Sequence, residues 1–157
     1  MAGTKEVVTY LRFNLRSQIY AKSLPMAMTI GAIKRLEIIQ AHPEYRERLW
    51  RVVYALQNGL REEGLDLGNT ESPVTPVFMK CPLSQVTQML YDLRENYNIF
   101  CSVVIYPVVP KDVVMLRLIP TAEHTLNDVA YTVKAFSELK RKIDNDVYPH
   151  EMADFSK

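Results

Sequence analysis

The stretch VVIYPVVPKDVVMLRLIPTAEHT, residues 103–125, decides the fold of this chain. Two runs rich in β-branched and aromatic residues, 100–106 and 113–119, flank a corner that holds two prolines, and such runs favour β-strands. Thr125 is expected to cap a helix, because Asp128 stands three residues later, where a capping box needs a carboxylate. The stretch therefore predicts two strands, a rigid corner between them and a helix that follows.

Arg117 interrupts the second run, in the sequence MLRLI. A charge inside an apolar strand is costly to bury unless an anion meets it. Arg117 is therefore a candidate for binding an anion. The alternative is an arginine on the solvent face of an edge strand, where it would contribute little. The spacing of the residues alone leaves both interpretations open.

Length and composition indicate an ordinary globular domain. The chain has 157 residues, of which 48% are hydrophobic and 24% are charged, enough for one domain with a real core. A net charge of +1 gives no reason to expect binding to nucleic acid or to a membrane surface. No apolar run approaches the roughly 20 residues that span a bilayer, and no signal peptide is recognisable. Cys81 and Cys101 suit a reducing compartment, so we expect a cytoplasmic protein.

The rest of the chain adds helices and one more strand. Apolar residues at helical spacing predict helices over residues 4–15, 25–41, 44–63, 82–96 and from 126 onward. Residues 73–80 predict a strand whose prolines favour an edge or a strand start. Residues 17–25 show no helical period and are expected to form an extended link.

These elements predict an α+β fold, in which helices cover one face of a small, three-stranded, mainly antiparallel sheet. We expect three segments along the chain. Residues 1–41 form a link and helices that lead into the domain, residues 42–143 form the α+β domain, and residues 144–157 form a loose polar tail.

Known catalytic motifs are missing from the sequence. It has no glycine-rich phosphate loop, no Gly-x-Ser-x-Gly and no His-Glu-x-x-His, and its histidines and cysteines do not have the spacing of a zinc site. Lys140 and Lys142 lie on polar helix faces, and no lysine has the surroundings of a buried Schiff-base lysine. Lys22 is the one lysine in a non-helical link beside apolar residues, which makes it a candidate for touching a ligand. The residues thus indicate an anion-binding arm without a complete catalytic site.

An ordered set of short segments lies at residues 10–17, 19–25, 64–68, 72–76, 106–110, 115–117 and 122–125. Together these segments resemble the C-terminal region of the α-oxoamine synthases. These enzymes use pyridoxal phosphate to join an acyl-CoA to an amino acid with loss of CO₂, and they include serine palmitoyltransferase, 8-amino-7-oxononanoate synthase and glycine C-acetyltransferase. The resemblance implies the small C-terminal domain of the aspartate-aminotransferase-like pyridoxal-phosphate enzymes.

The resemblance also assigns roles to residues that bind substrate. Arg117 matches the family arginine that grips the carboxylate of the amino acid, and a planar guanidinium in a dry site suits that task. Tyr106 and Val108 are expected near the mouth of the substrate site. Plain packing within a turn is the alternative for both of them.

In the family, the link after the first helix reaches across a dimer, and a serine in it contacts the cofactor phosphate of the neighbouring subunit. This chain has Ala21 at that serine's position. The resemblance therefore implies that Lys22 or Ser23 takes over the contact with pyridoxal phosphate.

The family's Schiff-base lysine precedes a Gly-Gly-aromatic segment, and this chain starts at Met1-Ala-Gly3, where that segment would be ending. We therefore expect a small domain without its cofactor domain, inactive alone, whose partners are an amino acid, an acyl-CoA, the missing domain and a second copy. Serine palmitoyltransferase-like and 8-amino-7-oxononanoate synthase-like chemistry both remain open. The alternative function is a stand-alone regulatory module that binds a small acid at Arg117 without catalysis.

Overall fold

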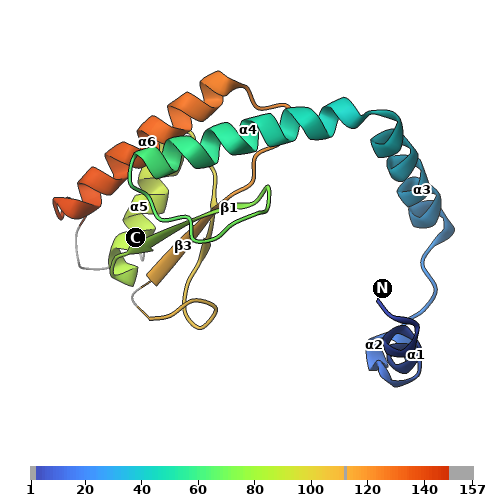
Figure 1. Cartoon of the computed structure of the whole chain (residues 1–157). Coiled ribbons are helices and arrows are strands. Elements are labelled where there is room, and N and C mark those ends of the chain that lie inside the picture. The colour runs from blue at the N-terminus through green and yellow to red at the C-terminus, as the bar shows by residue number, and fades with distance from the viewer. Residues whose placement is uncertain (1–2, 112, 149–157) are drawn as a thin grey trace. The chain divides into compact units, whose positions relative to one another are not determined.

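The computed structural model describes residues 3–111 and 113–148 (Figure 1). The chain divides into two compact units, Met1–His42 and Pro43–Lys157. This division falls beside the boundary expected between residues 41 and 42. Each unit is described by itself.

The first unit holds the helices α1 (Lys5–Asn14), α2 (Arg16–Ile19) and α3 (Met26–Ala41). Helix α1 begins after Thr4, whose side chain makes no capping hydrogen bond. The prediction of an extended link after α1 is wrong over residues 17–19, because they belong to α2, a single helical turn that is too short to show a helical period in sequence. None of the three helices contains a buried residue.

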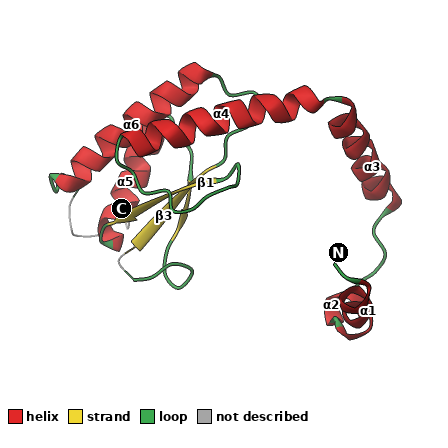
Figure 2. Cartoon of the chain, in the orientation of Figure 1, coloured by secondary structure: helices red, strands yellow, loops and turns green. Residues whose placement is uncertain are grey.

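The second unit holds three helices and three strands (Figure 2). In chain order they are α4 (Pro43–Glu62), β1 (Thr75–Lys80), α5 (Leu83–Glu95), β2 (Ser102–Val104), β3 (Val113–Leu118) and α6 (Leu126–Asp144). The predicted order of elements is confirmed, although β2 is shorter than the run of apolar residues that predicted it.

The three strands form one sheet in the order β1-β3-β2, and both strand pairs are antiparallel. The predicted α+β class with a small antiparallel sheet is confirmed. Strand β1, which contains Pro76, is an edge strand as expected. Strand β3 is the central one, so the interpretation of Arg117 as a residue of an edge strand is wrong.

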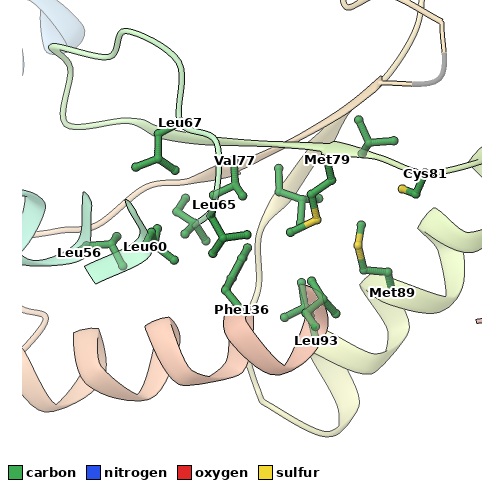
Figure 3. Close-up of a cluster of buried hydrophobic side chains, with 14 of the residues drawn as sticks. Leu56, Leu60, Leu65, Leu67, Val77, Met79, Cys81, Met89, Leu93 and Phe136 are labelled. Atoms are coloured by element: carbon green, nitrogen blue, oxygen red, sulfur yellow. The ribbon is translucent and has the colours of Figure 1, made fainter. Parts of the chain in front are cut away.

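The core lies between the sheet and the helices (Figure 3). Every second residue of β3 is buried, and Leu116 is fully enclosed. Side chains from α4, α5 and α6 pack against the same face of the sheet. These helix side chains include Leu60, Met89, Leu93 and Phe136. The opposite face of β3 carries Val113, Met115 and Arg117.

Helices α4 and α6 lie side by side over the sheet (Figure 1). They approach closely at Gly59, where a Cβ atom would stand 2.8 Å from Cγ2 of Val133. Lys140 Nζ donates to the carbonyl oxygens of Glu63, at 3.2 Å, and Gly64, at 2.8 Å, at the end of α4. These bonds satisfy carbonyls that the helix itself leaves without partners.

Helix α6 begins with the predicted capping box. The Thr125 hydroxyl accepts the N–H of Asp128 at 3.2 Å, and the Asp128 carboxylate accepts the N–H of Thr125 at 2.7 Å. The Asp128 carboxylate also accepts the Thr125 hydroxyl at 2.8 Å, and its two hydrogen bonds from the backbone N–H and the hydroxyl of Thr125 hold the pKa of Asp128 below its usual value. The cap fixes the point at which the chain turns from β3 into α6.

Residues 145–148 do not behave as the loose tail expected from their polarity. Tyr148 is buried, and its hydroxyl donates to the carboxylate of Asp92 on α5 at 2.6 Å. Gln85 donates to the carbonyl oxygen of Tyr148 at 3.2 Å and to Asp146 at 2.8 Å. The segment is therefore packed against α5, and the remainder of the predicted tail lies outside the described residues.

Candidate functional site

Arg117 lies on the central strand and faces away from the helices. It stands directly opposite Ser102 of β2 and Pro76 of β1 in the sheet register. Its Nε donates to Oγ of Ser102 at 3.0 Å. The register places these two side chains on the same face of the sheet, so the strand pairing itself aims the guanidinium.

The side chain of Arg117 is exposed, with no carboxylate of the described residues within ion-pairing distance. The expectation of a dry arginine is therefore wrong for this chain by itself. The Nε–Ser102 bond occupies one donor and leaves the two Nη groups for another acceptor. A guanidinium held in this way can bind a carboxylate through two parallel hydrogen bonds.

Tyr106 and Val108 lie in the loop between β2 and β3, and 58% and 77% of their surfaces are exposed. Val109 is the buried residue of this corner. The Lys111 ammonium lies 5.5 Å from the centre of the Tyr106 ring, a cation–π contact. Val109 is therefore the residue that packs this turn against the protein, and the side chains of Tyr106 and Val108 are accessible to a ligand.

Lys22 and Ser23 belong to the first unit, in the segment between α2 and α3. Both residues are exposed, and so are Tyr20 and Ala21 beside them. An ammonium and a hydroxyl in adjacent positions are donors of the kind that a phosphate group accepts from. The chemistry of Lys22 and Ser23 therefore fits the phosphate of pyridoxal phosphate. None of the helical residues in the described part of this unit is buried.

The ammonium of Lys142 is held by two side chains. Its ammonium donates to Asp92 at 2.6 Å and lies 5.1 Å from the centre of the Tyr97 ring. The hydrogen bond to Asp92 raises the pKa of Lys142, so the amine stays protonated. A Schiff-base lysine needs a free amine, and Lys142 therefore serves structure.

Ser102 is the residue of the candidate site that sequence reasoning missed. The sequence shows it as one small polar residue at the start of a strand, which carries little information by itself. The signal that could have found Ser102 was the expected pairing of the runs 100–106 and 113–119. In an antiparallel pair, each residue of one strand stands opposite a residue of the other strand. The register that joins Ser102 to Arg117 becomes visible only in the folded sheet.

A sequence profile for the aminotransferases of class I and II matches residues 1–136. The chain belongs to this family. The match extends over both compact units and includes Arg117, the β2–β3 loop and the link that holds Lys22 and Ser23.

Among curated proteins, the chain is 48% identical over 157 residues to a cysteate-C-fatty acyltransferase from Capnocytophaga ochracea. The matched region covers 100% of this chain and 37% of that protein. It is 34% identical over 134 residues to a serine palmitoyltransferase from Sphingobacterium spiritivorum, which covers 85% of this chain and 33% of the relative. An 8-amino-7-oxononanoate synthase from Thermosipho melanesiensis is 31% identical over 144 residues, or 91% of this chain and 36% of that protein. The chain thus spans about a third of the length of these relatives.

Solved structures give the same result. A serine palmitoyltransferase from S. paucimobilis superposes with a TM-score of 0.72 at 26% identity, covering 87% of this chain and 34% of that one. An 8-amino-7-oxononanoate synthase from Francisella tularensis superposes with a TM-score of 0.70 over 93% of this chain and 41% of that one; at 18% identity it supports the fold alone. The resemblance to α-oxoamine synthases is confirmed.

Within residues 3–111 and 113–148, no helix is both long and apolar enough to cross a membrane. The same residues hold no group of three or more histidine, cysteine, aspartate or glutamate side chains able to bind a metal ion.

Proposed function

We propose that this chain is part of a pyridoxal-phosphate-dependent enzyme that condenses an amino acid with a fatty acyl thioester and releases CO₂. The observation that carries the proposal is 48% identity, over the whole chain, to a protein named as a cysteate fatty acyltransferase. The serine palmitoyltransferase relatives support the same class of reaction. Cysteate and serine are therefore the two amino acids to test first.

In this proposal Arg117 binds the carboxylate of the amino acid. Its exposed Nη groups and its fixed Nε support that role, because a held guanidinium loses less freedom on binding. Tyr106 and Val108 line the entrance to the same site. When bound, pyridoxal phosphate supplies the electron sink that the loss of CO₂ requires.

Lys22 and Ser23 are proposed to contact the phosphate of the cofactor, in place of the serine that Ala21 replaces. A dimer is part of this proposal, because the family link serves the neighbouring subunit. The helices α1 to α3 support a partner, since none of their residues is buried in the described structure. Free Cys81 and Cys101 support a reducing compartment such as the cytoplasm.

This chain alone is proposed to be inactive. Lys142 and Lys140 are engaged in structural hydrogen bonds, and Lys22 is assigned to the phosphate rather than to covalent chemistry. Without a lysine that carries the cofactor, the chain supplies contacts to the substrate and to the cofactor phosphate but no covalent attachment. Pyridoxal phosphate added to the 157-residue chain should give no absorbance band that disappears when a single lysine is replaced.

The direct experiment uses the longer protein that contains this chain, loaded with pyridoxal phosphate. Cysteate, serine, glycine and alanine are each combined with short and long acyl-CoAs, and CO₂ and free thiol are measured together. We expect equal amounts of both products with one of the first two amino acids and a long acyl chain. Binding of small acids at Arg117 without either product would instead support a regulatory module.

A further inference from the structure

Two arginines of α4 and the segment before α6 border a hollow that the proposed function does not use. The hollow has a volume of about 370 Å³, and the residues that line it include Arg48, Arg51, His124 and Thr125. Arg117, which is assigned to the amino acid, does not line it. The hollow is therefore a candidate site apart from the one that holds the amino acid.

The two arginines share one side of α4, because they stand three positions apart in the helix. Arg51 is exposed, and no carboxylate of the described residues lies within ion-pairing distance of its guanidinium. Its N–H donors are thus available to an acceptor from outside the protein. Two guanidinium groups beside one hollow favour an anion in it.

Arg48 has a donor that the protein leaves unsatisfied. Its Nε is buried and has no hydrogen-bond partner among the described residues. The guanidinium lies 5.0 Å from the centre of the Tyr45 ring, and this cation–π contact holds the group in place. A buried donor without an acceptor costs free energy, and an anion beside the guanidinium would supply the acceptor.

Glu123 is the acidic residue that lines this hollow. Its carboxylate lies 3.7 Å from Nη2 of Arg48, so the two groups form an ion pair without a hydrogen bond. The Glu123 side chain is 84% exposed, and an exposed ion pair of this kind contributes little to stability. Glu123 is therefore a weak competitor for an anion at Arg48.

The start of α6 adds positive potential on the other side of the hollow. The capping box uses the N–H of Asp128, and helix geometry leaves the N–H groups of the two residues before it without an acceptor in the helix. Leu126, the first of these residues, lines the hollow. His124 Nδ1 accepts the N–H of Thr121 at 2.9 Å, so Nε2 is a donor. A helix start of this kind favours an anion.

We propose that this hollow binds a phosphate group, either as the free ion or as a phosphate monoester. Arg48 and Arg51 donate to its oxygens from α4, and the start of α6 donates from the opposite side. A phosphate group offers more acceptor oxygens than a carboxylate does, which suits donors that come from two elements. The ligand thereby ties α4 to the start of α6 and stabilises the second unit, a property beyond the proposed reaction.

The test is thermal unfolding of the 157-residue chain in sodium phosphate and in sodium chloride of the same ionic strength. Saturating phosphate should raise Tm by about 3 °C or more over chloride, because it binds the folded state. Arg48→Ala with Arg51→Ala should abolish this difference and weaken phosphate binding, measured by calorimetry, by about tenfold or more. Arg61→Ala, an exposed arginine in the last turn of α4, is the matched control and should retain both.

A third variant is expected to act in the opposite direction. Glu123→Gln removes the competing carboxylate and should strengthen phosphate binding by roughly threefold. Glycerol 3-phosphate separates the two sources of the phosphate group. A rise in Tm like that in phosphate would show that the site accepts monoesters, and a rise in phosphate alone would assign the site to the free ion.

Equal Tm values in phosphate and chloride would overturn this inference, and so would an unchanged affinity in the double arginine variant. In the longer protein the double variant should retain KM for both the amino acid and the acyl-CoA. A raised KM for either substrate would make the hollow part of the substrate site and contradict a separate phosphate site. Turnover measured without phosphate tests the proposed function independently.

Discussion

Arg117 and Ser102 face each other across the pair of strands β2 and β3, and the arginine Nε donates to the serine hydroxyl at 3.0 Å. Ser102 therefore acts as a positioning residue for the guanidinium. We expect Ser102→Ala in the longer protein to raise KM for the amino acid by about threefold and to leave kcat unchanged, because one neutral hydrogen bond is lost. Ser102→Thr retains the hydroxyl and should restore KM, whereas an unchanged KM in Ser102→Ala would remove this role.

Helices α4 and α6 are in contact at Gly59. We expect the effect of Gly59→Ala on the free energy of unfolding to depend on the side chain at Val133. Gly59→Ala should destabilise the fold by about 1–3 kcal/mol, because the new Cβ meets Val133 at 2.8 Å. In a Val133→Ala background the same change should be neutral or stabilising by up to about 1 kcal/mol, since alanine favours the helix. Urea unfolding of the four proteins measures this cycle, and equal effects in both backgrounds would contradict the close packing.

Asp92 predicts how stability depends on pH. Burial alone raises the pKa of Asp92, but hydrogen bonds from Lys142, Tyr148 and Asn96 outweigh it and lower the pKa below its usual value. A lowered pKa stabilises the fold above the unfolded value of about 3.9, and this stability is lost as pH falls through the folded pKa. Asp92→Asn should therefore cost roughly 1–3 kcal/mol near neutral pH and much less at about pH 3.

Unfolding by urea at the two pH values gives the measurement, with Asp66→Asn as the control, an exposed carboxylate in the turn before β1. Tyr148→Phe should weaken the same network by about 1 kcal/mol, since it removes one donor to Asp92. A destabilisation by Asp92→Asn that is the same at both pH values would show that the carboxylate charge is not what the network uses.

The elements that sequence reasoning predicted are those with a repeating signal. The buried alternation of β3, the stripe of α6 and the capping box at Thr125 are all local patterns, and each is present in the structure. Helix α2 was missed because one turn gives no period. The packed segment that ends at Tyr148 was missed because its burial depends on Asp92, 56 residues away in sequence.

The candidate site, like the fold, could be predicted from the sequence only in part. Arg117 could be singled out because a charge breaks an apolar run, but its exposure depends on which face of the sheet the helices cover. Ser102 could not be singled out, because the register that sets it opposite Arg117 exists only in the folded sheet.

The first unit predicts self-association. Large apolar side chains are exposed along α1 and in the link, including Tyr10, Phe13 and Tyr20. A surface of this kind favours contact with another chain. Sedimentation should show oligomers of the 157-residue chain that Tyr10→Ser with Phe13→Ser dissociates, while Tyr91→Ser in the second unit has no effect. A monomer at all concentrations would contradict the expected contact.

The central claim is that Arg117 binds the carboxylate of the amino acid substrate, and its most direct test is the dissociation constant of that amino acid for the longer protein. With cysteate or serine, whichever supports turnover, Arg117→Ala should weaken binding by about tenfold or more, and Arg117→Lys should recover only part of it. Arg94→Ala, an exposed arginine of α5, should bind as the unaltered protein does. An affinity in Arg117→Ala equal to that of the unaltered protein would contradict the account.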